Sequence, residues 1–212
     1  FLPAKDLLAY WVNVDFTPPP VMQTLIKRFS SQITLRTLRR NRFDEEMEIL
    51  RDIFNDAWSD NWGFVPFTRE EFAELGSSLR LLLPDDYIQI AEVNGEPAAF
   101  MVALPNLNEV LVELNGSLFP FGWLKMINRI RKHQIRTGRI PLMGVRKQFR
   151  NTPLGLALAC MVIDAPRKVA IARGVKEVEM SWILEDNAAM RGILDSIGSQ
   201  QYKRYRIYGK TL

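Results

Sequence analysis

Apolar and polar residues recur along the chain with two different periods, which indicates both helices and strands. The short run Ile33–Leu38 alternates and contains threonine, so it predicts a strand. Helical spacing follows, and its apolar positions are Phe43, Met47, Leu50, Ile53, Phe54 and Ala57. The sequence Thr-Arg-Glu-Glu at 68–71 has the form of a capping box and predicts a second helix that runs to about Leu82. The pattern therefore predicts one strand followed by two helices.

A β-hairpin is predicted where Asn94-Gly95 separates two β-favouring runs, Tyr87–Val93 and Pro97–Leu104. Asn-Gly favours the two-residue turns that join antiparallel strands. After a Pro/Asn loop at 105–109, the remaining predicted elements are a helix at about 121–134, a strand at 139–145, a helix at 153–172, a strand at 177–184, a helix at 187–197 and a strand at 201–208. This order predicts an α/β fold built on a mixed sheet.

The first 32 residues differ from the rest of the chain. Phe1–Val12 is apolar without a clear period, Pro18–Pro20 interrupts it, and Val21–Phe29 predicts a short helix. The chain begins with phenylalanine, which indicates a fragment or a processed product. We therefore expect residues 1–32 to be an appendage or the remnant of a preceding domain, and residues 33–212 to form the main domain.

The composition is that of a globular protein, with 47% hydrophobic and 25% charged residues in a chain of 212. Its single cysteine, Cys160, cannot form an internal disulfide, and with one histidine the chain has too few soft ligands for a structural zinc site. We expect no metal. No apolar run is long enough to span a bilayer, and the first residues lack the basic start and continuous apolar core that are typical of a signal peptide. We therefore expect a cytoplasmic protein without a membrane partner.

The net charge of +4 hides two blocks of opposite sign. Residues 44–113 contain 16 acids and 3 bases, whereas residues 115–173 contain 12 bases and 1 acid. This asymmetry argues against even coverage of nucleic acid, for which no groove-reading motif is present, and favours a local anion site in the basic block. The acidic block favours a cationic binding partner.

A strand that runs through polar residues into an apolar helix, at 142–158, predicts that anion site. Thr152 is placed to cap the helix and Pro153 to occupy its first position. The next three N–H groups should then point outward at the positive end of the helix dipole, and such a terminus binds anions. Gly155 would let a ligand approach the backbone. The residues that supply these N–H groups and the nearby positive charge are Leu154, Gly155, Leu156, Arg146, Lys147 and Arg150.

Two motifs in this part of the chain resemble those of the GCN5-related N-acetyltransferases, which transfer an acyl group from acyl-coenzyme A to an amine. In that family a central strand runs into an Arg/Gln-x-x-Gly-x-Gly/Ala loop that binds the coenzyme A pyrophosphate, and Arg150–Gly155 stands in that place. The second motif, an asparagine that opens a helix followed by glycine, resembles Asn187–Gly198. The resemblance covers Ile33 to Leu212.

The resemblance implies an α/β (α+β) fold with a largely antiparallel central sheet, helices on both faces and splayed central strands. It also implies acetyl-coenzyme A as cofactor and direct attack of an amine on the thioester. The acceptor would be a small-molecule or peptide amine, which the charge of the acidic block would make cationic. The residues expected to bind the cofactor are Met143, Gly144, Val145, Arg150, Asn151, Leu154, Gly155, Leu156 and Asn187.

Two departures from the family pattern bear on catalysis. Pro153 replaces the first glycine of the loop, and Leu194 stands where many members have a tyrosine that protonates the departing thiolate. A catalytically silent, coenzyme A-binding module therefore remains the alternative. Glu179 is the candidate base, because it lies in the middle of its strand beside the expected cleft; the alternative is a solvated or ion-paired glutamate. Strand alternation places it on one face with Glu177, Ser181 and Ile183. The last predicted strand contains three tyrosines that are available as general acids; the alternative is that they only pack in the sheet. They are Tyr202, Tyr205 and Tyr208.

Two further expectations concern the acceptor side and the loop. The aromatic residues between the first two predicted helices form either a substrate wall or a small core under a long loop. They are Trp58, Trp62, Phe64 and Phe67. Replacement of Gly155 by valine is expected to weaken coenzyme A binding and to leave the fold largely intact.

Overall fold

The computed structural model describes residues 1–80 and 83–210. The chain divides into two compact units. Unit 1 comprises residues 1–19, 104–141 and 170–212, and unit 2 comprises residues 20–103 and 142–169.

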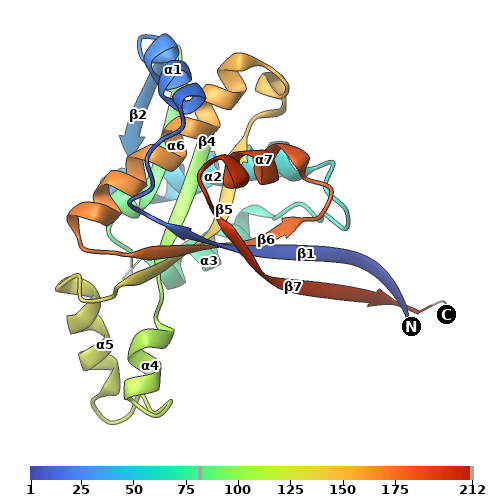
Figure 1. Cartoon of the computed structure of the whole chain (residues 1–212). Helices are drawn as coiled ribbons and strands as arrows, with labels where there is room; N and C mark the ends of the chain where they lie inside the picture. The colour runs from blue at the N-terminus through green and yellow to red at the C-terminus, as the bar shows by residue number, and fades with distance from the viewer. Residues whose placement is uncertain (81–82, 211–212) are drawn as a thin grey trace. The chain divides into compact units, whose positions relative to one another are not determined.

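The described elements alternate between strands and helices (Figure 1). In chain order they are β1 (Leu2–Asn13), α1 (Pro20–Phe29), β2 (Ile33–Thr37), α2 (Phe43–Trp58), α3 (Arg69–Leu79), β3 (Ile88–Val93), β4 (Glu96–Pro105), α4 (Asn108–Glu113), α5 (Gly122–Arg131), β5 (Thr137–Val145), α6 (Pro153–Ala172), β6 (Glu177–Leu184), α7 (Ala188–Ser196) and β7 (Gln200–Gly209), with short 3-10 turns at Arg40–Arg42, Asp85–Tyr87 and Lys147–Phe149. The predicted fold class, a mixed and largely antiparallel sheet with helices, is confirmed.

The strands follow the order β2-β3-β4-β5-β6-β1-β7, and β5 belongs to both units. In unit 2, β2 pairs with β3 and β3 with β4, both antiparallel. The predicted hairpin is confirmed, since Asn94 and Gly95 have φ values of 53° and 83°, as the turn between twisted strands requires. In unit 1, β6 pairs with β1 and β1 with β7, both antiparallel.

The central strands β5 and β6 are parallel. Their ladder joins Thr137–Ile140 to Glu177–Met180, the first half of each strand. It therefore ends where β5 passes from unit 1 into unit 2.

Residues 1–32 do not form the predicted appendage. Strand β1 lies between β6 and β7 and pairs with both, while α1 belongs to unit 2. Leu8, Ala9, Tyr10 and Val12 are buried. A strand with neighbours on both edges and cover on both faces has a continuous apolar sequence, so its period is hidden. The predicted boundary at residue 32 is therefore wrong.

The alternation of side chains along β6 is also interrupted. Leu8 pairs with Ile183 and Tyr10 with Met180, so β1 advances by two residues where β6 advances by three, and β6 carries an extra residue. Trp182 has a positive φ of 57° and a side chain that is 52% exposed. The predicted alternation therefore holds as far as Ser181, whose hydroxyl contacts Glu179, and a β-bulge interrupts it at Trp182.

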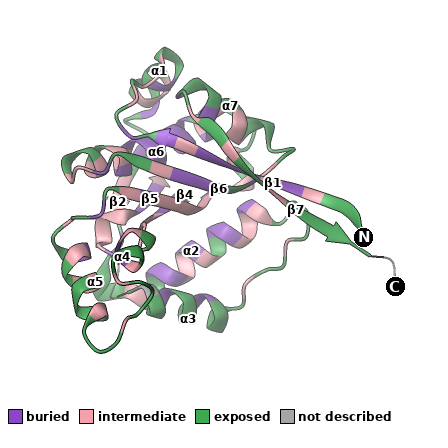
Figure 2. Ribbon diagram, turned by 60° about the horizontal axis from the view of Figure 1, so that its bottom comes forward, coloured by how far each residue is buried: buried purple, intermediate pink, exposed green. Residues whose placement is uncertain are grey.

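The helices of unit 2 follow the sequence closely. Figure 2 shows the buried residues of α2 along one of its faces. The capping box of α3 is present, with reciprocal bonds between Thr68 and Glu71. The helix ends at Leu79, and its predicted end at Leu82 lies outside the described residues. In unit 1, the predicted loop at 105–109 instead contains the start of α4, a helix with a single inward apolar residue, Val110.

A buried ion cluster lies in unit 2. The Arg36 guanidinium contacts the carboxylate of Glu46 at 2.5 Å and that of Glu92 at 2.5 Å. Glu46 is only 1% exposed. Burial opposes the charge of Arg36, but the two carboxylates outweigh it and raise its pKa.

Candidate anion-binding loop and carboxylate cluster

The first candidate site is the turn between β5 and α6, which lies wholly in unit 2. The Gly155 N–H donates to Thr152 Oγ1 at 3.0 Å, so the predicted cap is confirmed. The Leu156 N–H donates to the Thr152 carbonyl at 3.1 Å. The described bonds thus account for two of the three N–H groups predicted to face a ligand. Leu154 supplies the remaining one, because Pro153 has none.

Gly155 serves the chain's own turn. A Cβ on this residue would overlap the carbonyl oxygen of Phe149. The loop packs back on the first turn of α6 at this point, helped by Asn151 in the left-handed region at φ 56°. The expectation that Gly155→Val leaves the fold largely intact is therefore wrong.

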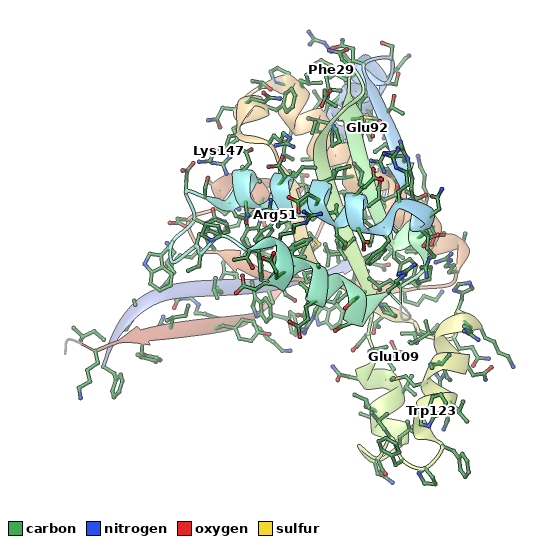
Figure 3. The ribbon with its side chains drawn as sticks, turned by 180° about the vertical axis from the view of Figure 1, so that it is seen from behind. Phe29, Arg51, Glu92, Glu109, Trp123 and Lys147 are labelled. Atoms are coloured by element: carbon green, nitrogen blue, oxygen red, sulfur yellow. The ribbon has the colours of Figure 1, made fainter. Side chains whose placement is uncertain are left out.

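The cations of this loop are paired with acids from α2 and the turn after it. Lys147 Nζ lies 2.6 Å from Asp60, and Arg150 Nη1 lies 2.9 Å from the same carboxylate (Figure 3 labels Lys147). Arg146 contacts Asp52 at 2.6 Å. The hydrogen bond from Lys147, with smaller contributions from Arg150, outweighs desolvation and lowers the pKa of Asp60. Acidic and basic blocks therefore neutralise each other here.

These residues fit a phosphate group, although not through a full backbone cradle. Lys147 and Arg150 share an exposed carboxylate, and an anion at the start of α6 would compete with it for both cations. Leu154 adds one backbone donor at the positive end of the helix. A coenzyme A pyrophosphate would accordingly be held by two side chains and one N–H.

The end of β5 packs against α2 at very short range. A Cβ on Gly144 would lie 2.9 Å from Phe100 and 3.2 Å from Ala57. Trp58 Nε1 donates to the Met143 carbonyl at 3.0 Å. Gly144 thus lets the helix approach the strand, and one carbonyl of the predicted cofactor edge, Met143–Val145, already has a partner. The role of this edge in binding stays a prediction.

The second candidate site surrounds Glu179 in unit 1. Glu179 is 4% exposed and lies 2.8 Å from Arg139. The hydroxyls of Ser181 and Tyr202 both donate to its carboxylate. Burial raises the pKa of Glu179, but these hydrogen bonds and the charge of Arg139 outweigh burial and lower it. A carboxylate with three donors and a lowered pKa is a weak proton acceptor, so the cluster is built to hold Tyr202 in place.

The ring of Tyr202 has two further contacts. Its ring lies 5.2 Å from that of Trp11, and Lys203 Nζ lies 4.6 Å from the ring centre. Desolvation and Glu179 raise the pKa of its hydroxyl. The sequence identified both Glu179 and Tyr202, but the distance of 23 residues between them gave no sign of their contact.

In the second family motif, Asn187–Gly198, the contacts described are those of a helix cap. Asn187 Oδ1 accepts the Met190 N–H at 3.1 Å and so caps α7. Leu194, which stands where many family members have a tyrosine, is fully buried. Its position therefore offers no acid. A contact of Asn187 with a cofactor stays a prediction.

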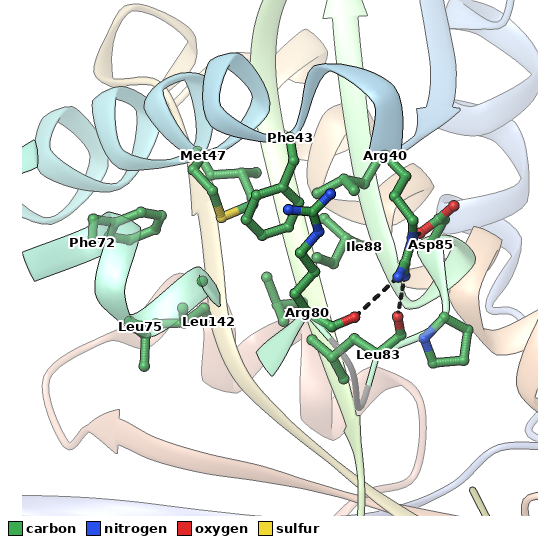
Figure 4. Close-up of a pocket in the computed structure, with 15 residues that line it drawn as sticks. Arg40, Phe43, Met47, Phe72, Leu75, Arg80, Leu83, Asp85, Ile88 and Leu142 are labelled. Carbon is green, nitrogen blue, oxygen red and sulfur yellow. Dashed lines mark hydrogen bonds and ion pairs between the residues drawn. The ribbon is translucent and has the colours of Figure 1, made fainter. Parts of the chain in front are cut away.

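A small apolar pocket lies in unit 2 between α2, α3 and the sheet (Figure 4). Its lining includes Met47, Phe72, Val102 and Leu142. Leu142 directly precedes the predicted cofactor edge in β5. At the rim, Arg40 holds the segment before β3, because its guanidinium donates to Asp85 and to the Arg80 and Leu83 carbonyls at 2.6, 3.0 and 2.6 Å.

The aromatic residues between α2 and α3 form a small core. Phe54 lies 4.7 Å from Trp58, 5.7 Å from Phe64 and 5.5 Å from Phe67, measured between ring centres. These contacts favour a small core under a long loop over a substrate wall. Trp62 is 48% exposed and stands apart from that cluster in the described contacts.

Two remaining expectations concern cysteine and metal. Cys160 is a buried free thiol, as predicted, and burial raises its pKa to about 11. Over residues 1–80 and 83–210, no three His, Cys, Asp or Glu side chains are grouped to hold a metal ion. In the same part of the chain, no helix has the length and apolarity to cross a membrane.

Two curated proteins resemble this chain along nearly its whole length. It is 48% identical over 208 residues to "Protein YghO" of Escherichia coli, covering 98% of this chain and 53% of that protein. It is 40% identical over 210 residues to "Bacterial ceramide synthase" of Caulobacter vibrioides, covering 99% of this chain and 55% of that protein. The chain thus spans about half the length of the curated relatives it matches. No family model matches it.

Solved structures establish the fold. A GCN5-related N-acetyltransferase from Sphaerobacter thermophilus matches with a TM-score of 0.58 and 20% identity, over 96% of this chain and 50% of that one. A tandem protein of the same family from the clavulanic acid biosynthesis pathway matches with a TM-score of 0.53 and 14% identity, over 95% and 52%. The chain has the GCN5-related N-acetyltransferase fold, as its two motifs predicted.

Proposed function

We propose that this chain is an acyl-coenzyme A-dependent N-acyltransferase of the GCN5-related family. The observation that carries the proposal is the turn between β5 and α6, where Lys147 and Arg150 meet at one exposed carboxylate, Asp60, shortly before α6 begins. In this fold, that turn is where a coenzyme A phosphate would bind. The alternative is a module that binds coenzyme A without catalysis.

We further propose that at least one substrate carries a long apolar chain. The relative named as a ceramide synthase makes, by its name, an amide of a long-chain amine. The pocket of unit 2 supports such a substrate, because its lining is almost entirely apolar. Asp52 and Asp60 do not add to the charge argument for a cationic acceptor, since both are paired within the chain. Acetyl transfer remains the alternative, and the experiment below includes acetyl-coenzyme A as a donor.

The reaction would form a carbon–nitrogen bond and break the carbon–sulfur bond of the thioester. Acyl-coenzyme A supplies the activated carbonyl. The amine must lose a proton, and the departing thiolate must gain one. Lys147 and Arg150 would neutralise phosphate charge, and Glu179 would position the Tyr202 hydroxyl. We propose Glu179 as a positioning residue in place of the predicted base.

Thiol release tests this function. The full chain is mixed with acetyl- or palmitoyl-coenzyme A and either a long-chain amine or a short polar amine, and free thiol is measured. We expect release with the palmitoyl donor and the long-chain amine. Binding of coenzyme A in a calorimeter without thiol release from any pair would support the silent module. No binding at all would contradict both readings.

A matched pair of variants locates the site. Lys147→Ala with Arg150→Ala should weaken coenzyme A binding about tenfold or more, because two charge-assisted contacts to phosphate are lost. The control, Lys27→Ala with Arg28→Ala, removes the same charge from α1 of the same unit. Equal weakening in both pairs would show a general effect of charge and not a site.

A further inference from the structure

The helices α4 and α5 form a hairpin in unit 1, residues 108–131, whose far end is apolar and exposed. They lie side by side, apart from the strands of the unit (Figure 1). Phe119 is 81% exposed and Phe121 is 72% exposed. The other large apolar side chains exposed here are Val112, Trp123 and Leu124. Exposed apolar patches of this kind mark interaction surfaces.

The base of the hairpin is firmly joined to the rest of unit 1. The Glu109 carboxylate accepts the backbone N–H groups of Arg136 and Thr137 at 3.0 and 2.7 Å. Val110 is fully buried and Ile130 is 7% exposed. In Figure 3, Glu109 lies where the hairpin leaves the strands and Trp123 lies farther out. The apolar exposure is therefore confined to the distal end.

The distal turn is an ordered structure that directs these side chains outward. The Trp123 N–H donates to the Leu118 carbonyl at 3.0 Å, and Trp123 Nε1 donates to the Pro120 carbonyl at 3.1 Å. Ser117 Oγ donates to the Phe119 carbonyl at 3.0 Å. A Cβ on Gly122 would lie 2.5 Å from the Ser117 carbonyl oxygen, so only glycine fits. The fold thus holds two phenylalanines away from its own core.

The chain around this turn is purely basic. Residues 115–136 contain five lysines and arginines and no acid. Glu113 of α4 engages two of them, Lys125 at 3.3 Å and Arg129 at 2.5 Å. Arg131 and Lys132 are exposed and follow Trp123 by eight and nine residues, about 12–14 Å along a helix axis. An apolar tip is therefore followed, farther along the same hairpin, by exposed cations that face the same side of a membrane as its anionic headgroups.

We propose that this hairpin inserts its tip, Leu118–Leu124, into the surface of a bilayer that contains anionic lipid. Exposed aromatic residues locate at the membrane interface, and cations beyond them bind anionic headgroups. A protein partner would require acidic groups to match these cations, whereas a membrane supplies negative charge without a specific geometry. The expectation of no membrane partner considered only spanning segments, and this surface would lie on the membrane. The inference does not depend on the proposed function.

Flotation with vesicles tests the proposal on the full chain. We expect binding to vesicles of phosphatidylcholine with phosphatidylglycerol and much weaker binding to phosphatidylcholine alone. Phe119→Ser with Phe121→Ser should reduce binding about tenfold or more, because two apolar anchors are lost. The control, Val21→Ser with Val65→Ser, removes exposed apolar side chains elsewhere and should bind like the unchanged protein.

Charge is tested separately by Arg131→Gln with Lys132→Gln. These changes should weaken binding to anionic vesicles and leave the weak binding to neutral vesicles unchanged. The proposal is overturned if the unchanged protein does not float with anionic vesicles, or if the serine pair floats as well as its control. It is also overturned if light scattering shows a self-associated protein that the serine pair dissociates while vesicle binding persists.

Discussion

The carbonyl oxygen of Phe149 occupies the space that a side chain on Gly155 would need. The glycine of the predicted phosphate loop is thus required by the loop's own path. A ligand-binding role for the loop must therefore rest on its cations, Lys147 and Arg150, and on the Leu154 N–H.

Gly155→Ala should destabilise the protein by about 1–3 kcal/mol, because the new methyl group forces the Phe149 peptide to move. Urea unfolding measures the effect. Gly192→Ala is the matched control in a helix, since no atom lies within 4 Å of its added Cβ. That variant should be stabilised by about 0.5–1 kcal/mol. Equal stability of the two variants would contradict the packing described for Gly155.

Asp60→Asn should strengthen binding of coenzyme A by about two- to tenfold, because the carboxylate that engages Lys147 and Arg150 is exposed and its pairs are weak. Calorimetry of both proteins gives the ratio. Glu74→Gln removes an exposed acid of α3 and should leave the affinity unchanged. If Asp60→Asn weakens binding, this carboxylate assists the ligand and does not compete with it.

Arg36→Met should destabilise the protein by about 3–5 kcal/mol, since Glu46 is then left charged and buried. Arg36→Met with Glu46→Met should recover much of that loss. Arg42→Met breaks an exposed pair with Glu45 and should leave the free energy of unfolding nearly unchanged. The three free energies of unfolding test whether burial sets the cost.

Asp6 should make the β1–β7 pairing sensitive to acid. The hydrogen bond from Arg206, followed by the charges of Arg206 and Arg204, lowers the pKa of Asp6 from 3.8 to about 2. The unfolded chain binds the proton first, so the stabilisation is complete above about pH 4 and is lost as pH falls toward 2. Asp6→Asn should lower the melting temperature at pH 7, and the difference from the unchanged protein should shrink through that window. Asp195→Asn, on an exposed face of α7, should show no such trend.

Glu179→Gln, Tyr202→Phe and their combination should lower thiol release to a similar extent, because the two residues act as one unit. The pH at which activity falls on the acid side should stay the same in Glu179→Gln. Loss of that acid limb, or a far larger effect of Glu179→Gln than of Tyr202→Phe, would identify Glu179 as the base after all.

Elements with local signals were predictable from the sequence. The capping box at Thr68, the Asn94-Gly95 turn and the Thr152-Pro153 helix start each lie within a few residues of the structure they specify. Contacts between distant segments were not predictable in this way. Strand β1 carries no period because it is enclosed, and the bulge at Trp182 depends on how β6 pairs with β1.

The two charge blocks show the same difference between what the sequence determines and what the tertiary structure decides. Sequence alone determined that residues 44–113 are acidic and residues 115–173 are basic. Only the tertiary structure decided that these blocks bind each other, through Asp60 with Arg150 in unit 2 and Glu113 with Arg129 in unit 1. The physical reason is range: charge is a property of each residue, whereas an ion pair between residues 90 positions apart exists only after the backbone has brought them together.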